Sequence, residues 1–475
     1  MILQVKNGVT IPKKYITENI YLKIKNDLII VNPTYISCIE YGKRPVIKTN
    51  SGKYVSIPKT ISFMKEYSDK IEVPRGYYYR LLEIFNDVEL EYQPCINIRD
   101  KLKEILPNIN LFDYQIKATE DLLKEPCGIL SSPAASGKTI IGINISAKLG
   151  YKTLWLVHLD RLMKQAINSF LESTGCKEED IGIISEGNYN VGNVFTSAII
   201  DTARKYRNQL SKEGFGTVII DECHRTPTKK VYDVLIKLSP RNLYGLSATP
   251  YRTDGLDDVM KYMIGPNVVE VEREPLVKMG RIITPKVEIV YTDILIKTGS
   301  LMSPYSDFIE SLVNNKKRNV MILYEVVKEL IEENVCLILS DRVSHCNELY
   351  TMLHNVYPKV EVVSGRTKKK EADLIVNKFM SKEILALITT YQFLGEGFDI
   401  PFLNRLFFCT PFKAPIRCEQ AVGRAQRSCG KNKEAKLCDF VDNNRLVRIQ
   451  LSNRLQVYDR LGCEVSFRKS DYAKN

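Results

Sequence analysis

The sequence lacks any run of about 18 consecutive apolar residues, the length that a membrane-spanning helix needs. Its first residues, Met1-Ile2-Leu3-Gln4-Val5-Lys6, also lack the charged lead and the apolar stretch of a secretory signal peptide. These absences predict a protein without a membrane partner. We expect it in the cytoplasm, either of a bacterium or of an infected cell.

The sequence also lacks the Cys-x-x-Cys spacing, although it contains 12 cysteines. That spacing is typical of zinc frameworks, and small secreted domains instead use dense, paired cysteines. The cysteines here are scattered singly. They therefore predict reduced and mostly buried thiols, without a structural metal.

Acidic residues are fewer than basic ones: 56 Asp and Glu stand against 68 Lys and Arg, for a net charge of +12. This excess favours a polyanionic partner such as nucleic acid, because Lys and Arg release counterions when they neutralise phosphates. A protein with a merely basic surface is an equally good explanation. Charge therefore supports a nucleic-acid partner without establishing one.

The length of 475 residues suggests about three domains of roughly 150 residues each. Residues 1–104 alternate short apolar runs with turn signals and predict a small strand-rich N-terminal domain. Two successive series follow, in each of which short apolar runs alternate with amphipathic segments. This texture predicts two tandem α/β domains, at residues 105–290 and 300–475, each with a parallel sheet covered by helices. We expect the hinge between them at about 285–305.

A phosphate-binding loop stands in the first of these domains, between a strand-like run and a helical pattern. Gly137-Lys138-Thr139 combines small residues that let backbone N–H groups approach phosphate with a lysine for the terminal phosphates and a hydroxyl for Mg²⁺. Ser132 departs from the motif, which has glycine there. The predicted nucleotide contacts in this loop are Ala134, Ala135, Ser136, Gly137, Lys138 and Thr139.

An acidic segment, Asp221-Glu222-Cys223-His224, follows the apolar run Val218-Ile219-Ile220. A carboxylate at the tip of a strand can hold Mg²⁺ through water, and a neighbouring glutamate can orient the attacking water. An acidic pair after a strand is usually a solvated loop. Here the phosphate-binding loop precedes it by about 80 residues, so one sheet can bring the two together.

Three more segments follow in order: Leu246-Ser247-Ala248-Thr249-Pro250, Glu396-Gly397-Phe398-Asp399-Ile400-Pro401, and Gln420-x-x-Gly423-Arg424-x-x-Arg427. With these segments the sequence resembles the superfamily-2 helicases from about residue 110 to residue 430. It looks most like the XPB-like translocases and the compact DNA branch-migration helicases of tailed phages. The resemblance implies that both α/β domains are RecA-like.

The resemblance also implies ATP and Mg²⁺ as cofactors. The implied catalytic residues are Lys138, Asp221, Glu222, Gln420, Arg424 and Arg427. Beyond the phosphate-binding loop, the implied nucleotide contacts are Gln115, Gly397 and Asp399, and the implied Mg²⁺ contacts are Thr139 and Asp221. His224, Ser247 and Thr249 are implied to couple hydrolysis to movement on the nucleic acid. An arginine supplied from the second domain can stabilise charge on the transferring phosphoryl group.

In this family, nucleic acid crosses both domains and is held mainly through its backbone. The implied contacts are Arg161, Gln165, Gly187, Thr196, Arg342, Arg366 and Thr390. We expect the N-terminal domain to bind DNA, and Tyr77-Tyr78-Tyr79 either stack on bases or pack into a core.

The leading hypothesis is an ATP-dependent DNA helicase or translocase that unwinds or branch-migrates forked and four-way DNA in recombination, repair or replication. We expect DNA as the partner, with recombination or replication proteins as further candidates. The alternatives are an RNA helicase and the motor subunit of a nuclease or restriction complex. Residues 1–100 show no nuclease cluster of the type Asp-x(n)-Glu-x-Lys.

Overall fold

The computed structural model describes residues 2–40, 44–48, 52–85, 87–92, 110–248, 256–292, 294, 305–394, 400, 402–426, 434–470 and 472. The chain forms two compact units. Unit 1 comprises residues 1–132 and 137–271, and unit 2 comprises residues 133–136 and 272–475. Across the described ranges, every helix is too short or too polar to span a bilayer.

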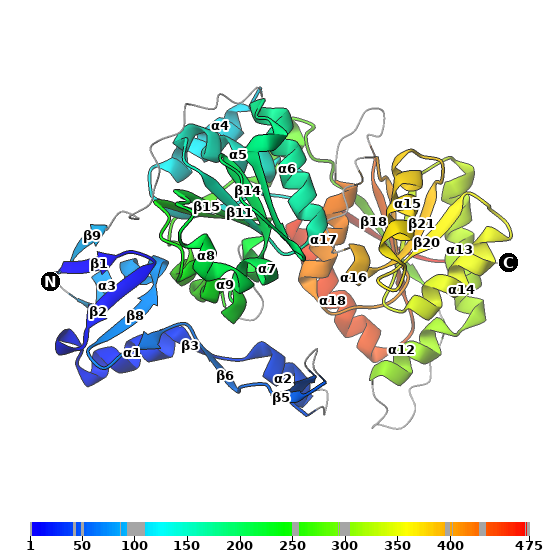
Figure 1. The fold of residues 1–475 in the computed structure, drawn as a ribbon. Coiled ribbons are helices and arrows are strands. Elements are labelled where there is room, and N and C mark those ends of the chain that lie inside the picture. Colours follow the sequence, from blue (N-terminus) through cyan, green and yellow to red (C-terminus); the bar gives the residue numbers. More distant parts are fainter. Residues whose placement is uncertain are drawn as a thin grey trace. The chain divides into compact units, whose positions relative to one another are not determined.

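Unit 1 begins with a five-stranded sheet in the order β7-β8-β2-β1-β9 (Figure 1). Its strands are β1 (Ile2–Val5), β2 (Gly8–Pro12), β7 (Lys65–Glu66), β8 (Lys70–Pro74) and β9 (Glu89–Tyr92). Helices α1 (Glu18–Leu28) and α3 (Tyr78–Ile84) accompany it, and the Thr17 hydroxyl accepts the Ile20 N–H at the start of α1. Leu3, Val5, Val9 and Ile11 are fully or almost fully buried in its core. The predicted strand-rich texture is therefore present.

An extension of this sheet domain, which we call the arm, spans residues 29–62. It contains β3 (Ile29–Val31), α2 (Pro33–Glu40), β4 (Val46–Lys48), β5 (Tyr54–Ser56) and β6 (Thr60–Ser62). Among the described residues of the arm, β3 pairs with β6 and β4 pairs with β5, both antiparallel. Each of these ladders is two strands wide.

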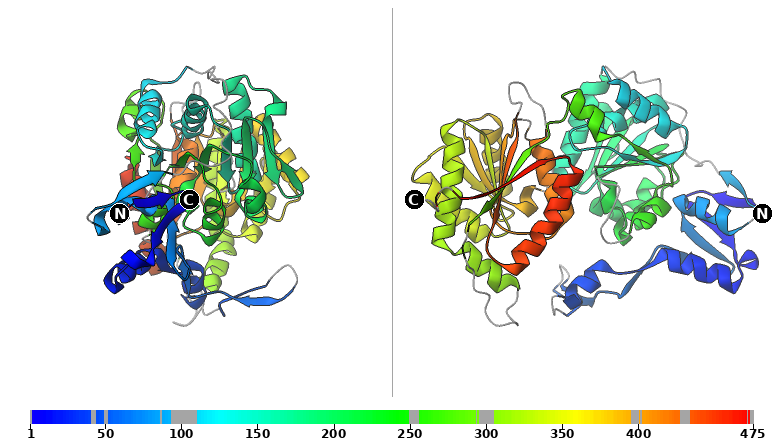
Figure 2. Two further views of the ribbon diagram at one scale, coloured as in Figure 1. Left: turned by 60° about the vertical axis from the view of Figure 1, so that its left-hand side comes forward. Right: turned by 180° about the vertical axis from the view of Figure 1, so that it is seen from behind.

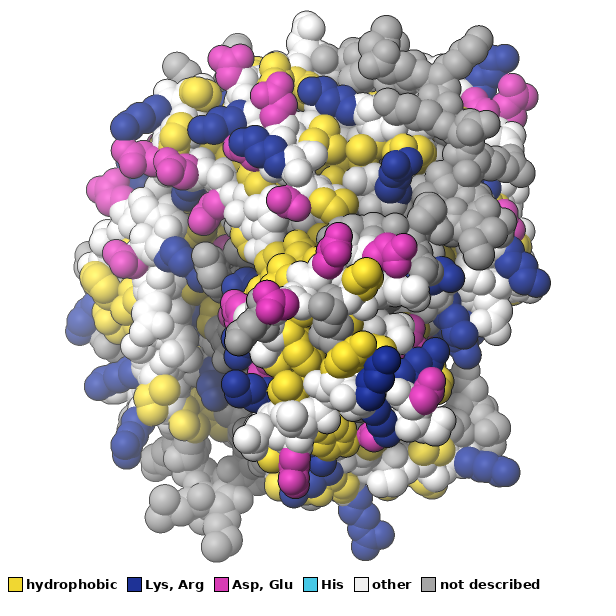
Figure 3. Space-filling view, turned by 90° about the vertical axis from the view of Figure 1, so that its left-hand side faces the viewer, with side chains coloured by type: hydrophobic (Ala, Val, Ile, Leu, Met, Phe, Trp, Pro, Cys, Tyr) yellow, Lys and Arg dark blue, Asp and Glu magenta, His cyan; other side chains and the backbone are white. Residues whose placement is uncertain are grey.

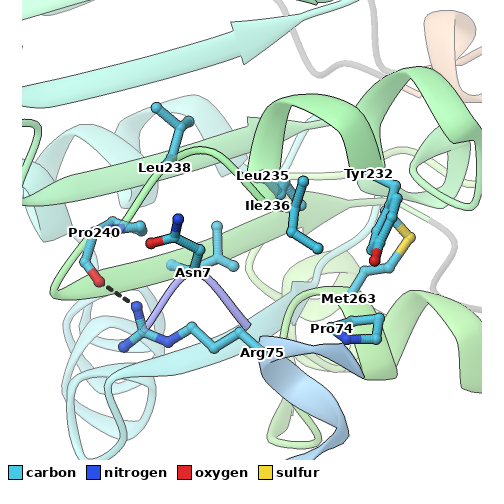
Figure 4. A pocket seen from close by; sticks show the side chains of 10 residues that line it. Asn7, Pro74, Arg75, Tyr232, Leu235, Ile236, Leu238, Pro240 and Met263 are labelled. Carbon is cyan, nitrogen blue, oxygen red and sulfur yellow. Dashed lines mark hydrogen bonds between the residues drawn. The ribbon is translucent and has the colours of Figure 1, made fainter. Parts of the chain in front are cut away.

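The segment Val73-Pro74-Arg75-Gly76 fastens the N-terminal sheet to the rest of unit 1. The buried Arg75 guanidinium donates to the backbone carbonyls of Pro240 and, at 2.9 Å, of Arg241 (Figure 4). At Gly76, an added Cβ would lie 2.3 Å from the Lys261 carbonyl oxygen, so the backbones meet too closely for any side chain. These contacts fix the segment, and with it the N-terminal sheet, to the α/β domain of unit 1.

Tyr77 continues that joint. Its ring is fully buried and meets the Tyr262 ring edge-on at 4.8 Å, and its hydroxyl donates to Asp27 at 2.8 Å. Burial and the Asp27 carboxylate raise the pKa of Tyr77 far above its usual range. Of the two roles considered for the tyrosine run, core packing holds for Tyr77.

The remainder of unit 1 is an eight-stranded sheet in the order β13-β12-β14-β11-β15-β16-β10-β17. All neighbouring strands are parallel except β12 and β13. The strands are β10 (Cys127–Ser131), β11 (Thr153–Val157), β12 (Ile181–Ser185), β13 (Asn188–Asn190), β14 (Phe195–Ile199), β15 (Thr217–Asp221), β16 (Asn242–Ser247) and β17 (Val268–Glu270). Strands β10, β11, β15 and β16 are buried along their whole length, as expected for a parallel sheet covered on both faces.

Helices cover both faces of this sheet (Figures 1 and 2). One face carries α4 (Asp113–Leu123), α5 (Lys138–Leu149) and α6 (Asp160–Thr174). The other carries α7 (Ile200–Lys205), α8 (Arg207–Leu210) and α9 (Lys229–Leu235). Helix α10 (Asp257–Met263) joins the same core. Side chains on this core merge with those of the N-terminal sheet into one apolar cluster.

Unit 2 is a seven-stranded parallel sheet in the order β20-β21-β19-β22-β23-β18-β24. Its strands are β18 (Lys286–Tyr291), β19 (Cys336–Ser340), β20 (Val360–Val363), β21 (Ala386–Thr390), β22 (Arg405–Phe408), β23 (Lys436–Val441) and β24 (Glu464–Lys469). Helices α13 (Lys316–Ile331) and α14 (Val343–His354) pack on one face. The other face carries α12 (Tyr305–Val313), α15 (Lys369–Met380), α17 (Pro415–Ala425) and α18 (Arg445–Arg460). Short helices α11 (Arg273–Lys278) and α16 (Tyr391–Leu394) complete it.

Two α/β domains of the predicted RecA-like type are therefore present, and the fold class is confirmed. One boundary needs correction. Residues 286–291, which the sequence analysis placed in the hinge and at the end of the first domain, form β18 between β23 and β24. Val287, Ile289 and Val290 are buried there, so the strand belongs to the second core. The other domain limits remain predictions.

A buried ion pair organises unit 2. The Arg454 guanidinium donates to both Asp439 carboxylate oxygens at 2.7 and 2.9 Å, and the Tyr458 hydroxyl donates to the same carboxylate at 2.9 Å. Arg454 also donates to the Phe412 carbonyl at 3.1 Å, three residues before α17 begins. The pair thereby holds the chain that leads into the Gln420–Arg427 segment.

Asp439→Ala should lower the free energy of unfolding by about 3–5 kcal/mol, because it leaves the buried Arg454 charge uncompensated. Denaturant titration of the purified variant measures this. The matched control is Glu434→Ala, which removes the exposed Lys286 pair at 3.0 Å and should cost less than about 1 kcal/mol. Equal losses in the two variants would show that Asp439 has no special role.

His345 lies in a second buried network of unit 2. The Arg342 N–H donates to the Ser340 hydroxyl, which lies 2.9 Å from His345 Nδ1, and His345 Nε2 lies 2.9 Å from Asn319 Oδ1. Because Asn319 Oδ1 can only accept, Nε2 carries the proton and Nδ1 accepts from Ser340. Burial and the nearby Arg318 charge lower the pKa of His345 to about 3.

This network predicts acid sensitivity. An unfolded histidine has a pKa near 6.5, so below that pH the unfolded chain binds a proton that folded His345 does not. Stability is therefore lost as pH falls from about 6.5 towards 3, by about 2 kcal/mol at pH 5. Denaturation of wild type and His345→Gln at pH 7.5 and pH 5 isolates this contribution. An acid loss that is the same in both proteins would contradict it.

Candidate ATP site and nucleic-acid track

The predicted phosphate-binding loop joins the end of β10 to the start of α5. Ala135 and Gly137 adopt left-handed backbone conformations, with φ of 69° and 80°. The Ser136 hydroxyl donates to the Pro133 carbonyl at 2.7 Å, and the Lys138 ammonium group donates to the Ser132 carbonyl at 3.3 Å. Residues Ala134 to Thr139 thus form a tight turn at the N-terminus of a 12-residue helix, where backbone N–H groups favour an anion.

Gln115 reaches this loop from α4. Its side-chain oxygen accepts the Phe112 N–H at 3.1 Å, and a Cβ added to Gly137 would lie 2.6 Å from its Nε2. Gln115 is buried, and the Thr119 hydroxyl donates to the Gln115 backbone carbonyl at 2.8 Å. The structure therefore brings the candidate base-reading side chain beside the phosphate-binding loop.

The acidic segment follows β15, whose last residue is Asp221. The Asp221 carboxylate is buried, and its Oδ1 accepts the Glu222 N–H at 3.0 Å. Glu222 takes a left-handed conformation, with φ of 51°. Burial, followed by the Glu222 charge, raises the pKa of Asp221 to about 7, while the Lys138 ammonium acts in the opposite direction. This carboxylate would be stabilised as an anion by a cation bound beside it.

Ser247 links the two halves of the site. Strand β16 lies between β15 and β10, and Ser247 is its last residue. Its backbone carbonyl accepts the Ser132 N–H at 3.0 Å, and its hydroxyl lies 3.1 Å from His224 Nδ1. His224 Nδ1 is in turn 3.3 Å from the Glu222 carboxylate. These contacts connect the acidic segment to the phosphate-binding loop, and the coupling role of His224 and Ser247 remains a prediction.

Three candidate track residues of unit 1 lie at the same edge of the sheet. The carboxyl end of β11 leads into α6, which holds Arg161 and Gln165, and the carboxyl end of β12 leads into the turn that holds Gly187. Arg161 and Gln165 are half-buried on α6, one turn apart. Gly187 is exposed, with φ of 77°, in the turn between β12 and β13.

Thr196 does not lie on that edge, and its assignment as a nucleic-acid contact needs correction. It is the second residue of β14, it is fully buried, and its hydroxyl accepts the Gly192 N–H at 3.1 Å. A threonine hydroxyl suits a phosphate contact, but the Thr196 hydroxyl instead binds the loop that precedes β14.

In unit 2, Arg342, Arg366 and Thr390 follow or end the adjacent strands β19, β20 and β21. Arg366 is exposed and Arg342 is half-buried, so both side chains reach the surface at this edge. Thr390 is buried, and its hydroxyl accepts the Phe393 N–H at 3.3 Å. Thr390 therefore has a local structural bond as well as its candidate role.

Gln420 and Arg424 lie half-exposed on α17, one turn apart. Four of the sequence candidates, Thr249, Gly397, Asp399 and Arg427, fall outside the described residues. For all of these positions the assigned roles remain predictions.

Residues 108–252 match the family model described as "Type III restriction enzyme, res subunit", and residues 318–429 match "Helicase conserved C-terminal domain". These matches contain the phosphate-binding loop, the acidic segment, Gln420 and Arg427. The chain belongs to the superfamily-2 helicases. The helicase domains imply ATP-dependent action on nucleic acid, and Mg²⁺ is typical of such sites.

The helicase has relatives named for both nucleic acids. It is 28% identical to the "Putative ATP-dependent RNA helicase L396" of Acanthamoeba polyphaga mimivirus, over 92% of this chain and 80% of that protein. It is 25% identical to the "DNA 3'-5' translocase XPB2" of Sulfurisphaera tokodaii, over 79% and 92%. It is 22% identical to the "ATP-dependent DNA helicase uvsW" of Enterobacteria phage T4, over 48% and 46%.

Solved helicase structures have the same fold. The structure of S. cerevisiae Dbp5 bound to RNA and ADP BeF3 matches with a TM-score of 0.56 at 16% identity, over 76% of this chain and 90% of that one. At this identity the likeness shows the architecture alone.

Two features of the helicase site were missed at the level of sequence. Asn144 donates to the Thr119 hydroxyl at 3.0 Å and so ties α5 to the helix that carries Gln115. An asparagine within the apolar run Ile140 to Ile145 was the available signal. The Arg273 guanidinium donates to the Gln426 side chain at 2.9 Å, next to the predicted Arg427, and no local pattern pointed to this pair.

Proposed function

We propose that this helicase is an ATP-dependent DNA helicase or translocase that unwinds or branch-migrates forked and four-way DNA. The observation that carries the proposal is the shared sheet edge of unit 1. Ser247 joins the phosphate-binding loop to the acidic segment there, and the track segments with Arg161 and Gly187 leave the same edge. A conformational change at the bound nucleotide would then be transmitted through packed residues to the contacts with the nucleic-acid strand.

ATP and Mg²⁺ fit the residues of this edge. Lys138 would meet the terminal phosphates, and Thr139 and the buried Asp221 carboxylate would hold the metal, whose charge would offset that burial. When bound, Mg²⁺–ATP supplies the phosphoryl group. Glu222 would orient the attacking water, and Gln420, Arg424 and Arg427 would act from unit 2.

DNA is favoured by the names of two relatives, the XPB2 translocase and the uvsW helicase. Roles in recombination, repair or replication, and contacts with proteins of those processes, belong to the same proposal. An RNA helicase is the second candidate, since the mimivirus relative is named as a putative RNA helicase. The third candidate is the motor subunit of a nuclease or restriction complex, which the restriction-enzyme description of the first family match supports.

The test is ATP turnover and strand separation with five substrates: duplex DNA, a DNA fork, a four-way DNA junction, duplex RNA and an RNA fork. We expect DNA to stimulate turnover and branched DNA to be unwound. Stimulation by RNA alone would reject the DNA proposal, and co-purification of a nuclease that needs this motor would favour the third candidate.

A further inference from the structure

The arm exposes more apolar surface than the rest of the N-terminal domain. Val31, Ile36, Ile39, Val46, Ile47, Tyr54 and Val55 are all between 41% and 69% exposed. Within the described part of the arm, helix α2 has no buried residue, and each ladder is only two strands wide. Such a ribbon is marginally stable alone, and clustered exposed apolar side chains mark interaction sites.

The charge of the arm indicates the kind of partner. Between residues 29 and 62 the sequence has five basic residues, Lys43, Arg44, Lys48, Lys53 and Lys59, and one acidic residue, Glu40. Figure 3 shows Lys and Arg mixed with Asp and Glu on the face of the molecule that it draws. Basic side chains around an exposed aromatic ring are typical of surfaces that bind nucleic acid, in which phosphates meet cations and bases stack.

A cavity of about 470 Å³ lies at the base of the arm, within unit 1. Asn32, Pro33 and Thr34 line it from the arm, and His158, Asp201, Arg225, Lys229 and Lys230 line it from the α/β domain. Its three cations outnumber its single carboxylate, although Lys230 pairs with Asp201 at 2.6 Å and Lys229 lies 3.7 Å from Asp233 outside the lining. This volume falls in the range that accommodates small ligands such as a nucleotide unit.

The cavity lies at the same edge of the sheet as the candidate track residues. His158 directly follows β11, and Asp201 follows β14, so both lie at the carboxyl edge that carries Arg161. The arm is held there by the Lys229 ammonium, which donates to the Ser62 carbonyl at 3.2 Å, and by the Phe63 ring against Tyr232 at 5.7 Å. Asn32 also bonds across the ribbon to the Pro58 carbonyl at 2.9 Å.

We propose that the cavity binds the phosphate backbone of a nucleic-acid strand beside the first RecA-like domain, and that the arm packs on unpaired bases of that strand through Tyr54 and its apolar neighbours. This rests on the proposed function in that the strand is the motor's substrate. The arm and the cavity together extend the contact region at the carboxyl edge of the first RecA-like sheet. Phosphate and base contacts of this kind are available to both DNA and RNA.

The first test reverses two exposed charges of the arm in the full-length protein, Arg44→Glu with Lys53→Glu. Binding to labelled DNA and RNA forks is followed by fluorescence anisotropy without nucleotide, over a range of salt concentrations. Affinity should fall at least about tenfold, and the salt slope should flatten by about 2, one contact per residue. The control, Lys23→Glu with Lys25→Glu on α1, makes the same change in net charge at exposed sites of the same domain.

Two further variants separate the parts of the surface. Tyr54→Ala should weaken binding to forks by about tenfold while leaving binding to blunt duplex nearly unchanged, because the ring meets unpaired bases. Lys229→Ala with Lys230→Ala should weaken binding to both. Thermal unfolding of each variant checks that the fold is intact.

Wild-type affinity and salt slope in all three variants would overturn the proposal, as would a loss equal to that of the α1 control. A selective loss on DNA or on RNA identifies which strand the arm holds. These binding measurements need no hydrolysis. If wild type neither hydrolyses ATP with nucleic acid nor unwinds it, the motor proposal fails while the arm proposal is still decided by binding.

Discussion

We expect Lys138→Ala to lower ATP turnover by about 10²–10³-fold or more, as loss of a single preorganised charge donor does in other sites. Lys138 opens α5, and its ammonium group lies 3.3 Å from the Ser132 carbonyl, at the turn where phosphate would bind. Alanine preserves the helix but removes the positive charge. Steady-state phosphate release, measured with saturating forked DNA, reports the change.

Nucleic-acid affinity of Lys138→Ala should stay within about twofold of wild type, because phosphate contacts are numerous and lie apart from this side chain. The control is Lys148→Ala, an exposed lysine in the last turn of the same helix, which should hydrolyse ATP normally. Loss of DNA binding in Lys138→Ala would contradict a separate nucleotide site and track.

Much of the fold was accessible from the sequence because parallel sheets leave a clear pattern. Strands β11 and β15 are short, continuous apolar runs, and each is buried over its whole length. The residues that follow such strands point to one sheet edge whatever the strand order is. The phosphate-binding loop and the acidic segment could thus be assigned to one site before their distance was known.

The contacts that make the site a unit were not accessible, because they depend on strand order. Ser247 contacts both Ser132 and His224 because β16, which ends at Ser247, lies between β10 and β15. The sequence also did not show that Thr196 is buried and that its hydroxyl accepts the Gly192 N–H instead of contacting a phosphate. In both cases a local pattern gave the residue type, and the tertiary fold decided its use.

The arm is another region in which the sequence pattern did not predict burial. Its sequence, with runs such as Leu28-Ile29-Ile30-Val31, resembles ordinary strands of a covered sheet. The structure instead leaves Val31 and the β4–β5 hairpin exposed and pairs each strand with a single neighbour. Only the fold distinguishes an apolar run that forms a core from one that is available to a partner.

Helix α17 gives the physical basis for the arginine prediction. Cys418, Ala421, Val422 and Ala425 are fully buried, so this face of the helix is fixed against the core of unit 2. Gln420 and Arg424 lie half-exposed on another face, one turn apart. Arg427 follows Arg424 by three residues in the sequence and lies outside the described residues.

Arg427→Ala should therefore lower the turnover number for ATP by about 10³-fold, the range of an arginine that stabilises the transferring phosphoryl group. ATP affinity should change much less, because that charge develops mainly in the transition state. Initial rates over a range of ATP concentrations, with forked DNA present, separate the two quantities. Arg427→Lys should restore little, since an ammonium group lacks the planar fork of the guanidinium.

The matched control is Arg417→Ala on the same helix, which removes an exposed arginine paired with Asp341 at 3.3 Å and should hydrolyse ATP close to the wild-type rate. Equal losses of turnover and ATP affinity in Arg427→Ala would indicate an arginine that only binds the nucleotide. Selective loss of turnover would instead assign Arg427 to stabilisation of the transferring phosphoryl group.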